Sequence, residues 1–212
     1  GRSFLVDRHT LDPRPETETL VEATLAFVAR KGAWGQKLRL LDLGTGTGCL
    51  LLTLLAELEG ATGVGTDVSA AALWLAGVNA RDLGVEARAR FVAGDWLDAI
   101  AWHFDLVVAN PPYLTTAEIG QLSREVRRHD PLVALDGGAD GLLFYRAIAE
   151  YWLPRLKPGG IVAVEIGEGQ AEEVSALFRV QREDDGLQID FMGQIDGFTS
   201  WESVRSRAET VR

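Results

Sequence analysis

An apolar segment that ends in a glycine-rich turn limits the possible folds of this chain more than any other part of its sequence. The apolar segment spans residues 38–43, alternate glycines follow in residues 44–48, and a leucine-rich stretch continues to Gly60. A buried strand, a tight turn and a helix in this order form the first half of a βαβ unit. The rest of the chain then has to supply parallel strands and the helices that cover them.

The same alternation of segments continues along the chain. Residues 157–160 predict a turn, and the pattern as a whole predicts an α/β fold with a mainly parallel sheet. On one of the helices, the predicted inner face consists of Leu73, Ala76, Ala80 and Leu83. The expected strands are 38–43, 61–67, 89–93, 104–109, 161–166 and 187–192, and the expected helices are 17–31, 49–60, 69–83, 142–156 and 170–178.

No linker or repeat divides the 212 residues, which is a usual length for one α/β domain. Residues 1–36 predict an N-terminal arm or hairpin and a helix that lead into the core, and residues 37–212 predict the core itself. The connection at 110–138 is longer than loops in compact domains usually are, which is typical of a functional segment.

Composition excludes several classes of protein. Acidic residues outnumber basic ones by 31 to 21, and this net charge of −10 argues against binding mainly to nucleic-acid phosphates or to an anionic membrane. One cysteine, Cys49, cannot form an internal disulfide or a cysteine zinc site. The three histidines show no ligand spacing, so no metal site is expected. Without a long apolar segment or a leader pattern, we expect a cytoplasmic protein.

The glycine turn is a candidate ligand site because ligands of open α/β sheets bind beyond the carboxyl ends of the strands. Glycine lets the backbone approach a ligand closely. A dinucleotide fingerprint needs a third glycine at the sixth position, where this chain has Cys49. The spacing therefore favours a nucleoside ligand without a pyrophosphate over NAD. The candidate residues are Gly44, Thr45, Gly46, Thr47 and Gly48.

Two acidic residues follow the next strands. Asp67 ends the second expected strand, where a carboxylate can accept hydrogen bonds from ribose hydroxyls, or can simply favour the start of a helix. Asp95 follows the third strand and can accept from an adenine amino group. Trp96 beside it can stack on the base, although one of six tryptophans can equally be a core residue.

The fourth expected strand ends in Asn110-Pro111-Pro112-Tyr113. Two prolines stiffen the backbone and remove two N–H donors, so acceptors remain: the side-chain oxygen of Asn110 and the carbonyl of Pro111. Tyr113 adds an aromatic wall. Such a group suits a planar NH2 that donates two hydrogens, whereas the alternative is an ordinary Asn-Pro turn.

Together these residues resemble the class I S-adenosylmethionine-dependent methyltransferases that modify planar nitrogens. More narrowly, the chain is similar to the HemK/PrmC type, the release factor glutamine N5-methyltransferases, over about residues 3 to 178. The segments that carry this resemblance are Pro13-Arg14-Pro15-Glu16-Thr17-Glu18, Glu125-Val126-Arg127, residues 134–142, and Glu165-Ile166-Gly167 with Gln170.

The resemblance implies a Rossmann-like sheet of seven strands, mostly parallel, with a terminal antiparallel strand. It implies that residues 44–48, Asp67, Asp95 and Trp96 bind S-adenosyl-L-methionine, and that Asn110 lies where cofactor and substrate meet. Asn110, Pro111 and Tyr113 would be catalytic and, with Pro112, would hold the glutamine of a Gly-Gly-Gln motif in a peptide chain release factor.

The family also carries a helical N-terminal docking domain that this sequence does not match, so we expect the catalytic domain without it, acting as a monomer. Residues 183–212 match the family poorly. No direct contact with nucleic acid or membrane is expected. The alternatives are a ribosomal-protein glutamine, an exocyclic amine of DNA or RNA, or a cofactor-binding protein without activity.

Overall fold

The computed structural model describes residues 1–95, 102–122, 131–181 and 189–193. The predicted elements are present with small shifts at their ends. The helices are α1 (Pro15–Arg30), α2 (Cys49–Glu57), α3 (Ala70–Asp82), α4 (Thr116–Ile119), α6 (Leu143–Ala147) and α7 (Ala171–Gln181). The strands are β1 (Arg39–Leu43), β2 (Thr62–Asp67), β3 (Ala89–Ala93), β4 (Phe104–Ala109), β5 (Leu156–Ile166) and β6 (Ile189–Gly193).

The strands form one sheet with the order β3-β2-β1-β4-β5-β6, and every neighbouring pair is parallel. The α/β class is confirmed. The count differs from the seven strands that the resemblance implied, because the described residues contain six strands and no antiparallel pair. The chain reverses its direction of winding between β1 and β4, which is where open sheets bind ligands.

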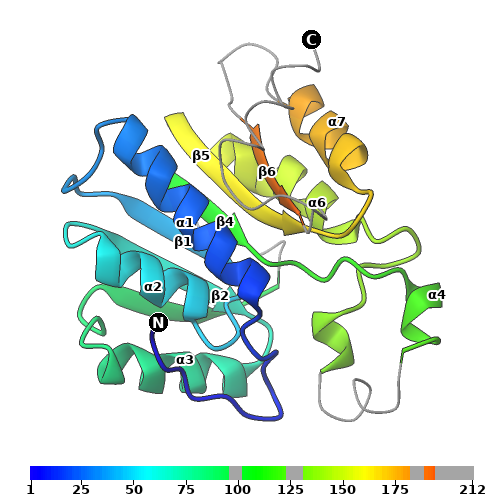
Figure 1. The fold of residues 1–212 in the computed structure, drawn as a ribbon, viewed down its shortest axis with the longest axis horizontal. Helices are drawn as coiled ribbons and strands as arrows, with labels where there is room; N and C mark the ends of the chain where they lie inside the picture. The colour runs from blue at the N-terminus through cyan, green and yellow to red at the C-terminus, as the bar shows by residue number, and fades with distance from the viewer. Residues whose placement is uncertain (96–101, 123–130, 182–188, 194–212) are drawn as a thin grey trace.

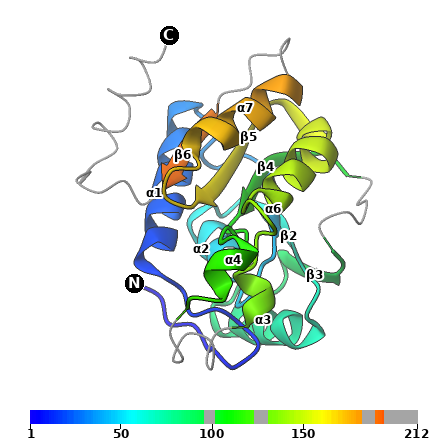
Figure 2. The ribbon, with the colours of Figure 1, turned by 90° about the vertical axis from the view of Figure 1, so that its right-hand side faces the viewer.

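Helices cover both faces of this sheet (Figures 1 and 2). Alternate residues of a strand point to opposite faces, so Leu40 packs with α1 and α2, whereas Leu41 packs with α6 and α7. Both leucines are fully buried. This burial on two sides explains why β4 and the last six residues of β5, in the middle of the sheet, are almost continuously apolar in sequence.

Two segments differ from expectation, whereas residues 1–14 form an arm with a turn at residues 8–10, which is one of the two expected alternatives. The expected helix at 142–156 changes after α6 into a π-helix (Ile148–Trp152) and a 3-10 helix (Leu153–Arg155). The turn predicted at 157–160 lies inside β5. Leu156 and Ile161 pair with Phe104 and Leu106 across a register shift, so the intervening residues bulge out of the strand.

The buried face of α3 is also shifted from the predicted one. Leu73 and Leu83 are only half-buried, and Asn79 is 2% exposed. The inner residues are Ala72, Leu75, Ala76, Asn79 and Ala80. Among the described residues, no helix is long and apolar enough to span a membrane.

Candidate functional site

The glycine turn connects β1 to α2 by a backbone that only glycine adopts easily. Gly44, Gly46 and Gly48 have φ angles of 68°, 54° and 81°. Between them, the N–H of Thr45 donates to the carbonyl oxygen of Thr66 at 2.8 Å, which attaches the turn to the end of β2. The turn therefore has one fixed shape at the carboxyl edge of the sheet.

Asp42 supports this turn from below. Its Oδ2 accepts a hydrogen bond of 2.6 Å from Oγ1 of Thr45, and its side chain is 1% exposed. Burial raises the pKa of Asp42 to about 7, while the bond from Thr45 opposes the rise. Its Oδ1 has no hydrogen-bond partner among the described residues. The sequence pattern alone had not assigned Asp42 a role.

Asp67 joins the glycine turn to the start of α3. Its Oδ2 accepts from the N–H of Gly46 and its Oδ1 from the N–H of Ser69, each at 2.9 Å. Ser69 in turn caps α3, since its Oγ accepts from the N–H of Ala72. The half-buried carboxylate of Asp67 thus contacts the start of α3, as the structural alternative predicted. It also lines the cavity above the glycine turn, where the predicted ribose contact would be made.

A cavity of about 240 Å³ lies above the glycine turn. The N-terminal arm forms one side of it with residues 9–13, and the ends of β2, β3 and β4, residues 131–134 and Phe144 contribute to the others. Of the predicted cofactor residues, the cavity is lined by Gly44, Thr45, Gly46, Thr47, Asp67, Asp95 and Asn110.

Two predicted cofactor residues are not placed at this cavity. Gly48 lies outside its lining and caps α2. A Cβ atom on Gly48 would lie 2.8 Å from Cδ1 of Leu52 and 3.3 Å from Cβ of Ala76, so both its φ of 81° and the close approach of α3 favour glycine there. Trp96 lies outside the described residues.

A second, wider cavity of about 1010 Å³ opens on the other side of Asn110. Pro111 and Tyr113 line it, together with Arg14 of the arm. Pro112, predicted to contact substrate, lines the first cavity instead. Asn110 lines both cavities and is the polar residue that separates them.

Helix α1 helps to orient Asn110. Its Nδ2 donates to Oγ1 of Thr17 at 3.5 Å, and Thr17 is buried at 6% exposure. Because the nitrogen faces Thr17, the Oδ1 acceptor is directed elsewhere, and no described residue donates to it. The amide therefore offers an acceptor at the junction of the two cavities.

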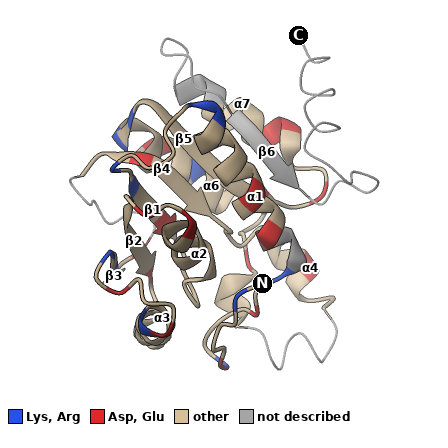
Figure 3. Ribbon diagram, turned by 60° about the vertical axis from the view of Figure 1, so that its left-hand side comes forward, with Lys and Arg blue, Asp and Glu red and all other residues tan. Residues whose placement is uncertain are grey.

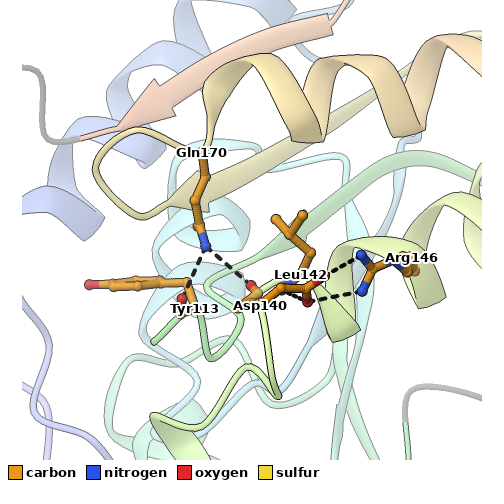
Figure 4. A network of polar contacts seen from close by, with 6 residues as sticks. Tyr113, Asp140, Leu142, Arg146 and Gln170 are labelled. Carbon is orange, nitrogen blue, oxygen red and sulfur yellow. Dashed lines mark hydrogen bonds and ion pairs between the residues drawn. The ribbon is translucent and has the colours of Figure 1, made fainter. Parts of the chain in front are cut away.

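Gln170 fastens the end of the Asn-Pro-Pro-Tyr segment (Figure 4). Its Nε2 donates to the carbonyl oxygens of Tyr113 at 3.1 Å and Gly141 at 3.3 Å, and its Oε1 accepts from the N–H of Gly167 at 2.9 Å. One side chain thus holds three loops in fixed relation. The sequence had marked Gln170 only as part of a family pattern, without a role.

The long connection after β4 folds against this segment. Leu114 forms a parallel bridge with Asp136, and a Cβ atom on Gly137 would come within 2.7 Å of the carbonyl oxygen of Pro112. The expectation of a functional connection agrees with this placement, because residues 114–118 and 134–142 contribute much of the wall of the second cavity.

The charged residues in the wall of the second cavity are mostly acidic. Figure 3 marks acidic positions in red on both α4 and α7. Asp140 pairs with Arg146, whose guanidinium holds the pKa of Asp140 down to about 2. The charged residues that line the cavity are Arg14, Glu118, Asp140, Glu165, Glu168 and Glu173.

A solved structure confirms the Rossmann-like methyltransferase fold. The hMettl16 catalytic domain, in complex with a 3′UTR hairpin, superposes with a TM-score of 0.65 over 85% of this chain and 67% of that chain. The sequences are 19% identical, so the likeness concerns the fold alone.

Sequence relatives are more similar. Residues 21–126, half of the chain, match the family described as the methyltransferase small domain. A release factor glutamine methyltransferase of Rhodospirillum rubrum is 54% identical over 171 residues, which cover 81% of this chain and 51% of that protein. One of Caulobacter vibrioides is 47% identical over 175 residues, 82% of this chain and 59% of that protein. This chain therefore spans between half and three fifths of their length. It belongs to the methyltransferase small domain family, as a relative of the release factor glutamine methyltransferases.

Proposed function

We propose that this protein transfers a methyl group from S-adenosyl-L-methionine to the side-chain amide nitrogen (N5) of a glutamine, in the Gly-Gly-Gln motif of peptide chain release factors. The observation that carries the proposal is the place of Asn110, which lines both the cavity above the glycine turn and the wider cavity beyond it. The names of the curated relatives support the choice of substrate.

The first cavity fits the cofactor. The alternate glycines leave room for the methionine part, since a Cβ atom on Gly46 would meet nothing closer than 4.0 Å. Asp67 keeps a second lone pair on each carboxylate oxygen for the ribose hydroxyls, and the exposed Asp95 lies where the adenine would end. When bound there, the cofactor supplies a methyl group on a positively charged sulfur.

The second cavity has to position glutamine rather than activate it. An amide nitrogen is a poor nucleophile because its lone pair is delocalised into the carbonyl. In our proposal Oδ1 of Asn110 and the carbonyl of Pro111 each accept one amide hydrogen, which directs the nitrogen toward the first cavity. The same acceptors stabilise the positive charge that develops on nitrogen, and the methylated nitrogen then releases one proton to water.

The charge of the second cavity supports a protein substrate over a nucleic acid. Five carboxylates and one guanidinium line it: Glu118, Asp140, Glu165, Glu168 and Glu173 against Arg14. Asp140 is balanced by Arg146, which leaves four carboxylates against one guanidinium. Phosphates would be repelled by such a surface, whereas nucleic-acid enzymes present a basic one. A release factor is a protein of translation, so the proposed place of action is the cytoplasm.

The substrate is tested with labelled S-adenosyl-L-methionine. The protein is incubated in parallel with a purified release factor, with ribosomal proteins and with RNA and DNA. We expect label on the release factor, and its loss when the glutamine of the Gly-Gly-Gln motif is replaced by alanine. Label on nucleic acid alone refutes the proposal, and label on a ribosomal protein alone changes the substrate but keeps the chemistry.

The role of Asn110 is tested by Asn110→Ala. We expect turnover to fall by roughly a hundredfold, because the amide is no longer aimed, while cofactor binding stays largely intact. Thr17→Val removes the acceptor that orients Asn110 and gives a smaller loss of turnover. The matched control is Thr24→Val on the same helix, since the Thr24 hydroxyl donates only to its own helix at Leu20. Near-normal turnover of Asn110→Ala contradicts the mechanism.

A further inference from the structure

One buried side chain, Asn79 on α3, fastens the N-terminal arm to the rest of the molecule. Its Oδ1 accepts from the N–H of Leu5 at 2.9 Å, and its Nδ2 donates to the carbonyl oxygen of Leu5 at 3.1 Å. Nδ2 also donates to the carbonyl oxygen of Thr47 at 2.9 Å. Asn79 thus connects the arm, α3 and the glycine turn through one amide group.

Both segments that Asn79 holds are walls of the first cavity. Thr47 lines it from the glycine turn, and residues 9–13 line it from the arm. Between Leu5 and this wall the arm bends sharply, because Asp7 accepts from the N–H groups of His9 and Thr10 at 2.8 and 3.1 Å. In Figure 1 the dark blue arm passes α3 and returns toward α1.

The hydrogen bonds explain why an asparagine stands at this position. Both hydrogens of its amide and its oxygen are used, and every partner is a backbone atom. Aspartate would lack the two donors and would bury a charge, and leucine would lack all three bonds. The side chain of Leu5 is 51% exposed, so Asn79 recognises residue 5 by its backbone and not by its side chain.

The other contacts of the arm are weaker anchors. Arg2 forms an ion pair of 2.6 Å with Glu57, but both side chains are about one third exposed, and such surface pairs contribute little. Phe4 packs against the core and is only half-buried. Asn79 is therefore the contact that sets where the arm begins its bend.

We propose that Asn79 is a positioning residue for cofactor binding, which holds residues 9–13 against the glycine turn and so keeps the wall of the first cavity in place. The inference rests on the proposed binding of S-adenosyl-L-methionine in that cavity. Asn110 is held by Thr17 of α1, and the next part of the segment, at the carbonyl of Pro112, packs against Gly137 of the connection after β4. Loss of Asn79 therefore weakens cofactor binding and leaves turnover at saturating cofactor unchanged.

The test measures the Kd of S-adenosyl-L-homocysteine by titration calorimetry. Asn79→Leu removes hydrogen bonds to two segments, and we expect the Kd to rise about tenfold, the factor that corresponds to roughly one net hydrogen bond. Leu5→Pro removes the N–H group that donates to Oδ1 of Asn79, so we expect it to raise the Kd as well. Leu5→Ala is the matched control and binds as the parent does, because only the backbone is recognised.

Two further measurements separate this role from general support of the fold. The double variant Asn79→Leu with Leu5→Pro should bind no more weakly than Asn79→Leu alone, because the hydrogen bond that Leu5→Pro removes is one of the three that Asn79→Leu removes. Trypsin should cleave after Arg8, on the arm, faster in Asn79→Leu and in Leu5→Pro than in the parent protein.

The proposal is overturned if Leu5→Pro binds S-adenosyl-L-homocysteine as the parent does, or if Asn79→Leu lowers kcat without changing the Kd. If Asn79→Leu fails to fold, Leu5→Pro decides alone. Calorimetry uses no methyl acceptor, so this test remains valid even if the methyl acceptor is not a release factor. A parent protein that does not bind S-adenosyl-L-homocysteine contradicts the proposed function first.

Discussion

Among single residues, Asp42 shows most clearly how burial changes chemistry. A carboxyl group at 1% exposure accepts one bond from Thr45 and no bond from the described residues at its Oδ1. The ionised form is therefore poorly solvated, and the pKa of Asp42 rises from 3.8 to about 7. Asp42 thus supports the glycine turn, but its burial lowers the free energy of unfolding near neutral pH.

This shift predicts how stability depends on pH. Between pH 4 and 7 the folded protein keeps a proton on Asp42 that the unfolded chain has lost, so the stabilising contribution is complete below about pH 4 and disappears as pH rises through 7. Asp42→Asn lacks this titration. Relative to the variant, the parent should lose about 4 kcal/mol of unfolding free energy between pH 4 and 8. Chemical denaturation across this range measures it, and parallel curves for the two proteins would show the prediction to be wrong.

At the scale of elements, the shape of the glycine turn depends on how closely β2 approaches it. A Cβ atom on Gly65 would lie 2.7 Å from Oγ1 of Thr45 and 3.0 Å from Cδ1 of Phe91. The strand therefore accepts no side chain at the point where it passes under the turn. Here a glycine is required for space and not for its dihedral freedom.

We accordingly expect Gly65→Ala to move Thr45 away from Asp42. Overpacking of this kind destabilises by roughly 1–3 kcal/mol and should also weaken the binding of S-adenosyl-L-homocysteine. The matched control is Gly77→Ala on α3, where a Cβ atom meets nothing within 4 Å. Alanine in a helix should stabilise that variant by about 1 kcal/mol. Thermal unfolding measures the stability of the two variants, and calorimetry measures their binding of S-adenosyl-L-homocysteine. Equal stability and equal binding would show that Gly65 is not required for space.

The loops around the second cavity depend in the same way on Gln170. Gln170→Glu keeps the size of the side chain but loses both donors to Tyr113 and Gly141. Two neutral hydrogen bonds correspond to about 2 kcal/mol, so we expect the KM for the protein substrate to rise and the Kd of the cofactor to stay constant. Glu172→Gln, an exposed change in the first turn of α7, two residues after Gln170, is the control. A rise in the Kd of the cofactor, with an unchanged KM for the protein substrate, would contradict this prediction and show that Gln170 supports the first cavity.

At the scale of the whole molecule, ligand binding should be visible as stability. S-adenosyl-L-homocysteine at a hundred times its Kd should stabilise the folded protein by about 2.7 kcal/mol, since it binds only the folded state. NAD at the same concentration should give no shift, because the turn has Cys49 where a dinucleotide site has its third glycine. Denaturation with each ligand tests this, and stabilisation by NAD would contradict the interpretation of the glycine spacing.

The sequence by itself determined the βαβ architecture and the strand ends that carry the site. Apolar runs, the glycine turn and Asn110-Pro111-Pro112-Tyr113 are local patterns, and parallel strands bring their carboxyl ends to one edge. Asp67, Asp95 and Asn110 therefore meet at one cavity, as the spacing predicted. The role of Trp96 stays a prediction, because that residue lies outside the described part of the chain.

Only the tertiary structure decided which residues hold this site in shape. Asn79 contacts Leu5, 74 residues away, and Gln170 contacts Tyr113, 57 residues away. The structure also assigned Gly48 to packing, Pro112 to the first cavity and Asn110 to the boundary between the two cavities. Local sequence patterns report what one segment buries or exposes. A bond between a buried side chain and a distant backbone depends instead on where the sheet places both segments.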